Sequence, residues 1–545
     1  MKITVAQLNY HIGNFEGNTA KMLDAVAKAK KDKADIICFS ELATCGYPPR
    51  DFLEFDDFIR LGEESITKLA KAAQDIAIVV GSVSRNPVLE GKDLHNSVYF
   101  LEEGKMKYVQ HKTLLPTYDI FDEYRYFEPA SEWGIVEYKG KKIALTVCED
   151  IWNIGNENPL YKICPLDEMI KYEPDFILNV SASPFDHNHA NDRINIVKAN
   201  CERYKIPMVY VNHVGAQTEI VFDGGSLIAS GDGFIHEELP FFKECIKTFD
   251  LADIEKTKKD NINTKEKIAL IHDAIVLGIK DYFGKLGFTK AILGLSGGID
   301  SAVTLALAAR ALGAENVHAL LMPSQYSSDH SVDDAVGLAE NLGSPYNIVP
   351  IKGIYDAVMD QMSPIFEDRP FNVTEENIQA RARGLLNMAM SNKFGNILLN
   401  TSNKSEMAVG YGTLYGDLCG GLSVIGDVYK TDVFLLAEYI NKDKEIIPVN
   451  TITKPPSAEL RPNQKDSDSL PDYDILDEIL YQYIELTKDP QDIVAMGYDE
   501  ALVKRILKMV NRNEFKRYQT APVLRVSSKA FGMGRRMPIV GKYLS

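Results

Sequence analysis

Short apolar runs bounded by polar residues recur along the first 255 residues of the chain. Five of these runs are apolar almost throughout, and they cover 34–41, 77–83, 142–150, 175–183 and 207–214. Runs of this length without polar alternation are typical of strands buried between two layers. Helical segments stand between them, so this half of the chain is predicted to be a layered α/β structure.

A different pattern begins after residue 260. The long helical segment 268–287 leads into an apolar run at 291–293, and further apolar runs follow at 318–324, 347–351 and 396–400. Helical stretches separate these runs. Single strands that alternate with helices predict a doubly wound parallel sheet.

A polar and charged stretch, 252–267, separates the two patterns and is almost free of core-forming residues, as a linker or the approach to a surface helix would be. A chain of 545 residues is too long for one core, so two domains of roughly 200–300 residues are expected. We therefore predict an N-terminal domain over 1–255 and a C-terminal domain over 265–545.

Composition narrows the class of protein. A hydrophobic content of 45% with 25% charged residues is typical of a soluble globular protein. The net charge of −17 argues against a nucleic-acid partner, because phosphate backbones select clustered Lys and Arg. The seven cysteines are scattered without CxxC or zinc spacing, which favours a cytoplasmic location. The alternating start is unlike a signal peptide, and no apolar run could span a bilayer, so we expect no membrane partner.

Residues 296–301, Ser-Gly-Gly-Ile-Asp-Ser, stand between an apolar run and a helical stretch. Such a loop offers backbone N–H groups and the positive end of a helix dipole to an anion. Its two glycines let the backbone approach a phosphate closely and adopt positive φ. Asp300 can hold Mg²⁺ against the phosphates. The Gly-Lys-Ser/Thr ending of a Walker A loop is absent. The loop resembles the pyrophosphate-binding loop of the N-type ATP pyrophosphatases, and the alternative is an ordinary strand–helix turn.

Three chemically active residue types follow strands in the first half: Glu41 at the end of 34–41, Lys112, and Cys148 after 142–147. A carboxylate can take the thiol proton, the thiolate can attack an amide carbonyl, and the ammonium can stabilise the oxyanion. Taken singly, a cysteine after a buried strand is usually a core residue, and a lone Glu or Lys is usually on the surface.

The surrounding segments Phe-Ser-Glu-Leu, His-Lys-Thr-Leu-Leu-Pro and Val-Cys-Glu-Asp resemble the nitrilase (carbon–nitrogen hydrolase) family over about residues 1–250. The resemblance implies an α-β-β-α sandwich with Glu41, Lys112 and Cys148 as the catalytic triad. It implies that Glu123 is a second glutamate beside the triad. Glutaminase members of this type further imply glutamine contacts at Tyr118, Ser183 and His189, although the family more often has a long basic side chain at the last position.

The second half carries further polar segments at strand ends and helix starts. Asn377, Arg381 and Arg383 fall at the start of a predicted helix, and the two arginines cannot share one face closely. Thr401 and Glu406 follow the apolar run 396–400, at the edge of the sheet where ligands bind. The glycine-rich stretch 411–421 is either a flexible connector or a binding loop.

Six ordered segments, beginning at 296, 322, 377, 401, 411 and 454, together resemble the glutamine-dependent NAD⁺ synthetases over essentially the whole chain. The reaction implied is ATP + nicotinic acid adenine dinucleotide (deamido-NAD⁺) + L-glutamine + water → NAD⁺ + AMP + PPi + glutamate. The implied ATP contacts are Gly294, Leu295, Ser296, Gly297, Gly298, Ile299, Asp300, Ser301, Thr401, Lys430 and Ser457. The implied dinucleotide contacts are Asn377, Arg381, Glu406 and Lys516, and the implied Mg²⁺ ligands are Asp300 and Glu406.

The chemistry explains these residue types. A carboxylate is a poor acyl donor until adenylation gives it a leaving group, and charge on the phosphate oxygens is then stabilised by Mg²⁺, Lys430 and the loop N–H groups. Because ammonia must stay unprotonated and water must not reach the adenylate, we hypothesise an internal tunnel from Cys148 to the second site.

Two alternatives remain at this point: an ATP-dependent amide ligase with another carboxylate substrate, and a nucleotide-sensing scaffold that has lost its chemistry. The resemblance also implies a homo-oligomer, without deciding between dimer, tetramer and octamer.

Overall fold

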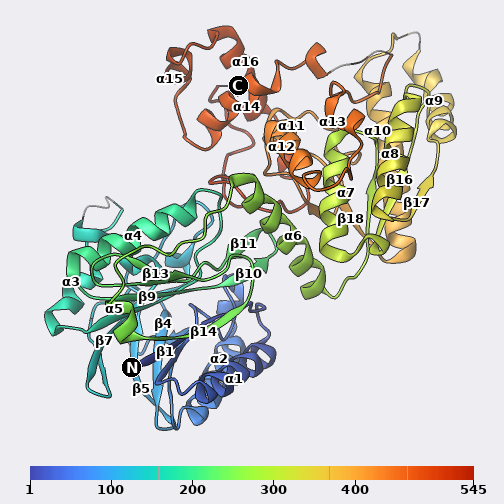
Figure 1. Ribbon diagram of the computed structural model, residues 1–545. Coiled ribbons are helices and arrows are strands. Elements are labelled where there is room, and N and C mark those ends of the chain that lie inside the picture. The colour runs from blue at the N-terminus through green and yellow to red at the C-terminus, as the bar shows by residue number, and fades with distance from the viewer. Residues whose placement is uncertain (157–159, 368, 463, 465, 545) are drawn as a thin grey trace. The chain divides into compact units, whose positions relative to one another are not determined.

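The computed structural model describes residues 1–156, 160–367, 369–462, 464 and 466–544 (Figure 1). The chain forms two compact units, Met1–Lys265 and Glu266–Ser545. Each unit has its own sheets and its own core, so the two are described separately.

The first unit is built on two six-stranded sheets, with orders β14-β1-β2-β3-β4-β5 and β13-β12-β9-β8-β7-β6. The strands of the first sheet are β1 Lys2–Gln7, β2 Ile36–Cys38, β3 Ala77–Arg85, β4 Leu94–Glu102, β5 Lys105–His111 and β14 Cys245–Asp250. Those of the second are β6 Val136–Tyr138, β7 Lys141–Val147, β8 Phe176–Ser181, β9 Met208–Asn212, β12 Leu227–Ala229 and β13 Ile235–Glu238. A separate hairpin pairs β10 Val214–Gln217 with β11 Ile220–Asp223.

Helices cover the outer faces of both sheets. They are α1 Phe15–Lys31, α2 Asp56–Ala72, α3 Pro165–Met169 and α4 His189–Tyr204. The short helix α5 Leu251–Glu255 instead packs on the core between the sheets. One core fills the space between the sheets, with Val79 and Leu178 on its two sides. A second core packs Met22 and Leu69 of α1 and α2 on the first sheet, and a third packs Val197 of α4 on the second. The predicted α-β-β-α sandwich is confirmed (Figure 1).

Two local predictions in this unit were wrong. Glu41 does not end its strand, because β2 stops at Cys38 and the carboxylate lies in the turn that follows. The polar stretch 252–267 is not a linker from its start, because α5 buries Leu251 and Ile254 in the core between the sheets.

The second unit has one five-stranded sheet, all of it parallel, in the order β17-β16-β15-β18-β19. Its strands are β15 Ala291–Gly294, β16 Val317–Leu321, β17 Tyr346–Ile348, β18 Ile397–Asn400 and β19 Leu422–Ser423. The predicted doubly wound sheet is confirmed. The strand order reverses between β15 and β18, and ligands bind at such a switch point, beyond the carboxyl ends of the strands.

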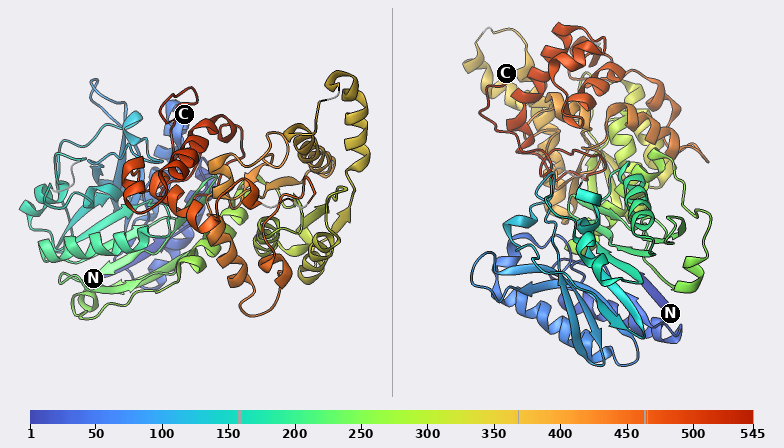
Figure 2. Two further views of the ribbon diagram at one scale, coloured as in Figure 1. Left: turned by 90° about the horizontal axis from the view of Figure 1, so that it is seen from above. Right: turned by 90° about the vertical axis from the view of Figure 1, so that its left-hand side faces the viewer.

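Helices surround this sheet, as Figure 2 shows in two further views. They are α6 Lys267–Leu286, α7 Ile299–Leu312, α8 Asp329–Leu342, α9 Lys352–Phe366, α10 Val373–Phe394, α11 Lys404–Val409, α12 Lys430–Ile440, α13 Val449–Thr453, α14 Tyr473–Ile484, α15 Pro490–Ala495, α16 Glu500–Arg512 and α17 Glu514–Arg517. Three of them, α14, α15 and α16, enclose with α11 a core of their own, which includes Leu480 and Ile506.

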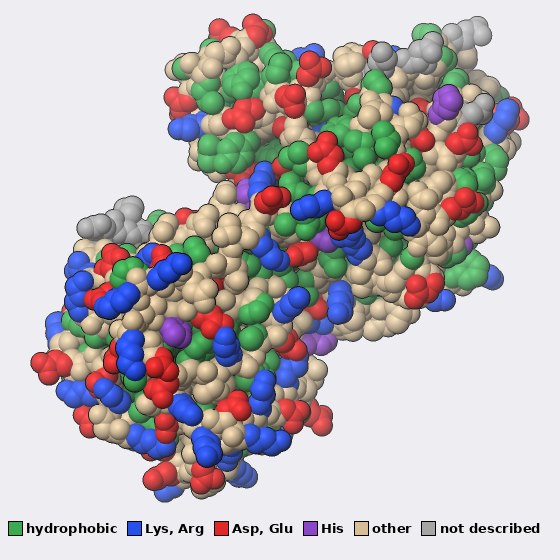
Figure 3. Space-filling model, viewed as in Figure 1, with side chains coloured by type: hydrophobic (Ala, Val, Ile, Leu, Met, Phe, Trp, Pro, Cys, Tyr) green, Lys and Arg blue, Asp and Glu red, His purple; other side chains and the backbone are tan. Residues whose placement is uncertain are grey.

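Two surface properties bear on the predicted partners. On the first unit, the face in Figure 3 mixes Lys and Arg with Asp and Glu, without a large area of one sign. Across the described ranges, no helix is both long enough and apolar enough to cross a bilayer.

Candidate active sites

The ammonium of Lys112 is the centre of the polar cluster in the first unit. Lys112 follows β5, its side chain has no exposed surface, and its Nζ donates to Glu41 Oε1 and to Glu123 Oε1, each at 2.8 Å. Burial alone would lower the pKa of Lys112, but Glu123 and Glu41 outweigh it and raise that pKa well above its usual range. Lys112 is therefore a fixed cation inside the sandwich.

The two glutamates differ in their other partners. Glu41 also accepts hydrogen bonds from Asn96 Nδ2 at 2.7 Å and from the backbone N–H of Ala182 at 2.9 Å. Glu123 also accepts one from the Tyr47 hydroxyl at 2.8 Å. Burial, followed by the charge of Glu41, raises the pKa of Glu123 to about 7 against the opposing effect of Lys112.

Cys148 follows β7 in a strained backbone conformation. It has φ 43° and begins the 3₁₀ turn Cys148–Ile151. Such a conformation is rare for a residue with a Cβ and is found most often at functional sites. The residue is 5% exposed, and burial, with the charge of Glu41, raises the pKa of its thiol well above the usual range. The thiol is therefore protonated at rest and needs a base to become a nucleophile.

Asp150 connects the turn that begins at Cys148 with the segment that follows Lys112 through hydrogen bonds, a role that sequence reasoning missed. Its carboxylate accepts from the N–H groups of Thr113 and Leu114, each at 2.9 Å, and from that of Val147 at 3.0 Å. One fully buried side chain thus fixes the residues that flank both Lys112 and Cys148.

The predicted glutamine contacts form two groups around this turn. The Tyr118 hydroxyl donates to Glu149 Oε1 at 3.0 Å, and Tyr118 remains 41% exposed. The Ser183 hydroxyl lies 2.9 Å from His189 Nε2, and the His189 ring stacks on Trp152 with 5.2 Å between ring centroids. Sequence reasoning missed Glu149 and Trp152, whose roles depend on contacts made only in the fold.

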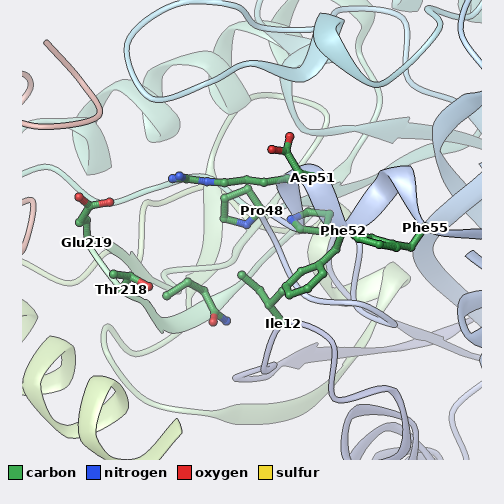
Figure 4. Close-up of a pocket in the computed structure, with 10 residues that line it drawn as sticks. Ile12, Pro48, Asp51, Phe52, Phe55, Thr218 and Glu219 are labelled. Atoms are coloured by element: carbon green, nitrogen blue, oxygen red, sulfur yellow. The ribbon is translucent and has the colours of Figure 1, made fainter. Parts of the chain in front are cut away.

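A separate cavity of about 410 Å³ lies in the same unit (Figure 4). It is lined by Ile12, Pro48, Pro49, Arg50, Asp51, Phe52, Phe55, Gln217, Thr218 and Glu219. Its lining includes none of the predicted catalytic or glutamine-binding residues.

In the second unit, the loop 296–301 follows β15 and begins α7 at the switch point of the sheet. Gly297 has φ 82°, and a Cβ there would lie 2.1 Å from the carbonyl oxygen of Ser331. Gly298 has φ −81°, so only the first of these two glycines needs the left-handed region, against the prediction. The Ser296 and Ser301 hydroxyls lie 3.1 Å apart and form a hydrogen bond within the loop.

Lys430, at the start of α12, joins the two predicted metal ligands. Its ammonium pairs with Asp300 and lies 3.5 Å from Glu406 Oε1, and its side chain is 2% exposed. Burial and the charge of Asp300 raise the pKa of Glu406 to about 8, with Lys430 opposing them. Asn403 completes the group by donating from Nδ2 to Asp300 Oδ1 at 2.9 Å.

Asp466 is a third carboxylate near this group that sequence reasoning missed, because its segment reads as a polar loop. It is 5% exposed and accepts hydrogen bonds from the hydroxyls of Tyr411 at 3.2 Å and Tyr473 at 3.0 Å. Burial raises its pKa, and the charge of Lys430 opposes that rise.

Two carboxylates and their surroundings fit a Mg²⁺ ion that also binds a nucleotide. Mg²⁺ in such sites takes one or two carboxylates together with substrate phosphates, rather than a full set of protein ligands. The described part of the chain contains no group of three or more His, Cys, Asp or Glu side chains placed to hold a metal. Burial and the charge of Asp300 keep the pKa of Glu406 raised despite Lys430, so a further cation at this position would favour the ionised carboxylate.

Three of the predicted dinucleotide contacts converge on the loop 411–417. Thr413 Oγ1 donates to Asn377 Oδ1 at 2.7 Å, and Arg381 Nε donates to the Leu414 carbonyl oxygen at 3.2 Å. Lys516 Nζ donates to the carbonyl oxygens of Gly410 and Gly412 at 2.7 and 2.8 Å. The glycine-rich stretch is therefore held by these residues and is not a loose connector.

The remaining predicted ATP contacts are less tightly placed. Thr401 is half-buried directly after β18. Ser457 is exposed, and its hydroxyl donates to the Gln464 carbonyl oxygen at 2.6 Å, inside its own loop. Glu459 of the same loop accepts a hydrogen bond from the Ser331 hydroxyl at 2.8 Å, and Ser331 lies beside Gly297 of the loop 296–301.

Comparison with known proteins agrees with this division of the chain. The carbon-nitrogen hydrolase family model matches residues 2–259, and the NAD synthase family model matches residues 271–520. A glutamine-dependent NAD(+) synthetase from Synechocystis sp. is 45% identical, with 98% of each chain covered. One from Thermotoga maritima is 38% identical, with 100% of this chain and 99% of the relative covered.

A solved structure extends the agreement to the fold. The glutamine-dependent NAD+ synthetase of Acinetobacter baumannii, in complex with ADP, is 39% identical and covers 99% of both chains with a TM-score of 0.78. By its sequence and its fold over the whole length, this chain belongs to the glutamine-dependent NAD(+) synthetases.

Proposed function

We propose that this protein is a glutamine-hydrolysing NAD⁺ synthetase, which amidates deamido-NAD⁺ with ammonia taken from L-glutamine and consumes ATP to AMP and PPi. The observation that carries the proposal is the pairing of two sites on one chain. One is the buried Lys112 group beside the Cys148 thiol. The other lies at the switch point of the five-stranded sheet and consists of residues 296–301, which we call the nucleotide loop, together with Lys430 and Glu406.

In the first unit, Cys148 is the nucleophile and Glu41 the base. Glu41 takes the thiol proton as sulfur attacks the glutamine amide carbon, and Lys112 stabilises the oxyanion. Collapse of the tetrahedral intermediate breaks the C–N bond, and Glu41 returns its proton to the leaving nitrogen as ammonia departs. Water then attacks the thioester carbon while Glu41 takes its proton, the C–S bond breaks as glutamate is released, and Glu41 returns the proton to the Cys148 sulfur.

Glutamine recognition is assigned to the two groups beside the cysteine turn. Tyr118, Ser183 and His189 present hydroxyl and imidazole groups that can bond the polar ends of glutamine. Trp152 stacks on His189 and so limits how that ring can turn.

In the second unit, the nicotinate carboxylate attacks the α-phosphate of ATP and PPi departs. Lys430 and the N–H groups of the loop 296–301 stabilise the charge on the phosphate oxygens. Asn377, Arg381 and Lys516 hold the dinucleotide against this loop. Ammonia then attacks the acyl carbon of the adenylate, and the C–O bond to AMP breaks.

We assign Mg²⁺ to Asp300 and Glu406. A bound Mg²⁺ would neutralise the phosphate charge and orient the phosphates. Lys430 pairs with the same carboxylates, so a bound Mg²⁺ and Lys430 would together neutralise Asp300.

A product assay tests the proposal as a whole. Incubation with deamido-NAD⁺, ATP, Mg²⁺ and glutamine should yield NAD⁺, AMP, PPi and glutamate in equal amounts. Release of PPi with other carboxylates but not with deamido-NAD⁺ would favour a different amide ligase, and no turnover with glutamine or ammonia would favour the sensing scaffold.

Two further properties are part of the proposal. The protein acts in the cytoplasm as a homo-oligomer, without a nucleic-acid or membrane partner, which mass measurement in solution and cell fractionation would check. Ammonia passes from Cys148 to the adenylate through an internal tunnel. With ¹⁵N-amide glutamine and unlabelled ammonium in the buffer, the tunnel predicts NAD⁺ that stays fully labelled.

A further inference from the structure

The side chain of Asn96 bridges the two carboxylates of the first site. Asn96 lies on β4 with no exposed surface, and its Nδ2 donates to Glu41 Oε1 at 2.7 Å and to Glu123 Oε2 at 3.4 Å. Its backbone carbonyl oxygen accepts the N–H of Lys112 at 2.8 Å. Asn96 thus contacts both carboxylates of the cluster through its side chain and the backbone of Lys112 through its own backbone.

The arrangement of hydrogen bonds limits where Glu41 can take a proton. Each carboxylate oxygen accepts about two hydrogen bonds. Oε1 of Glu41 already has two donors, Lys112 Nζ and Asn96 Nδ2, while Oε2 has one, the N–H of Ala182. The open acceptor position is on Oε2, and it exists there because Asn96 occupies Oε1.

The other end of the same amide shows that this arrangement has a cost. Asn96 Oδ1 is buried and has no hydrogen-bond partner among the described residues. A buried acceptor without a hydrogen bond destabilises the fold. An apolar side chain at this position would avoid that cost, so the amide is explained by what its nitrogen does for the carboxylates.

We infer that Asn96 is a positioning residue for glutamine hydrolysis. It holds Glu41 with Oε2 free for the Cys148 proton, and it separates Glu41 from Glu123 by placing an N–H on each. The inference rests on the proposed glutaminase role of the first unit. Glu41, Lys112, Glu123, Tyr47 and Cys148 are the titratable groups that face one another around the amide.

The test compares Asn96→Leu and Asn96→Asp with Tyr99→Phe in the full-length enzyme. Tyr99 lies on the opposite face of β4, packed toward the helices, and its hydroxyl donates to the Val83 carbonyl oxygen at 3.2 Å. Its substitution removes one buried hydrogen bond from the same strand without touching the carboxylates. Glutamine hydrolysis, ammonia-dependent NAD⁺ synthesis, thermal unfolding and the rate of Cys148 alkylation, resolved by peptide mass spectrometry, are measured for each.

Asn96→Leu should lower kcat for glutamine hydrolysis by about 100-fold, the effect of misplacing a catalytic group by about 1 Å, with little change in KM. Asn96→Asp, of nearly the same volume, should move the acidic limb of the pH profile to higher pH, because a third carboxylate raises the pKa of its neighbours. Alkylation of Cys148 should slow in both, while ammonia-dependent synthesis stays at the wild-type rate. Tyr99→Phe should keep wild-type kcat and pH profile.

If Asn96→Leu does not fold, the pH profile and alkylation rate of Asn96→Asp decide the question. Asn96 variants with wild-type kcat, pH profile and alkylation rate would overturn the inference, as would a Tyr99→Phe variant with the same losses. A wild-type enzyme that does not hydrolyse glutamine would instead refute the proposed function.

Discussion

Gly297 offers the sharpest test of how the nucleotide loop is built. Its φ of 82° lies in the left-handed region, where a residue with a Cβ is strained by about 1–2 kcal/mol. A Cβ at this position would lie 2.1 Å from the Ser331 carbonyl oxygen and 2.8 Å from the Ser331 carbonyl carbon, both backbone atoms in the first turn of α8. Relief of such a clash in a packed site costs about 1–3 kcal/mol more.

Gly297→Ala should therefore destabilise the second unit by about 2–5 kcal/mol, the sum of the two costs. Gly298→Ala is the matched control, because at φ −81° its Cβ would meet only Ser296 Oγ, at 3.3 Å. This control should keep wild-type stability, while a higher KM for ATP would report that the Cβ obstructs the phosphates.

Equilibrium urea unfolding with and without ATP measures the effect. The transition that ATP moves to higher urea belongs to the unit that binds it, because a ligand stabilises the state to which it binds. Ammonia-dependent synthesis should fall with Gly297→Ala, while glutamine hydrolysis in the other unit persists. Equal stability of the two alanine variants would refute the assignment of strain to Gly297.

Four further outcomes follow from the two sites. Cys148→Ala should abolish glutamine-dependent synthesis and spare ammonia-dependent synthesis, and an equal loss of both would contradict separate sites. Removal of Mg²⁺ with EDTA should stop synthesis with either nitrogen source but leave glutamate release intact, as measured by product analysis. Asp150→Ala removes the acceptor of three buried N–H groups and should lower the free energy of unfolding of the first unit by at least about 3 kcal/mol, as measured with urea. An unchanged urea midpoint would contradict this role of Asp150. Burial, with the charge of His95, lowers the pKa of His111 to about 4. The unfolded chain therefore takes up the proton first, so stability should fall as the pH drops from about 6.5 to 4, by roughly 2 kcal/mol for this half-buried group. His111→Asn should show a smaller loss over that range than wild type, and an equal loss would contradict it.

Local patterns in the sequence were enough for much of the architecture. Apolar runs that lack alternation predicted the buried strands on both sides of the division, because strands covered on two faces must be apolar throughout. Residues 291–301 predicted a strand, a glycine loop and a helix start, and the structure has β15, the loop and α7 there. The identities of Glu41, Lys112 and Cys148 likewise came from short segments that resemble a known family.

The sequence could not reveal which residues hold these groups in place. No pattern in the sequence marked Asn96, Asp150 or Asp466 as a functional residue. Each acts through contacts with segments far along the chain: Asn96 with Glu41, Asp150 with the lysine segment, and Asp466 with Tyr411.

The difference has a physical cause. Periodicity and glycine placement are set by the conformation of a few neighbouring residues, so they can be recognised in the sequence alone. The burial of a carboxylate, the donors it receives and the space around a glycine depend on chain crossings between distant segments. Only the tertiary structure decides that Gly297 and not Gly298 is the strained glycine, and that a buried amide divides its two N–H groups between Glu41 and Glu123.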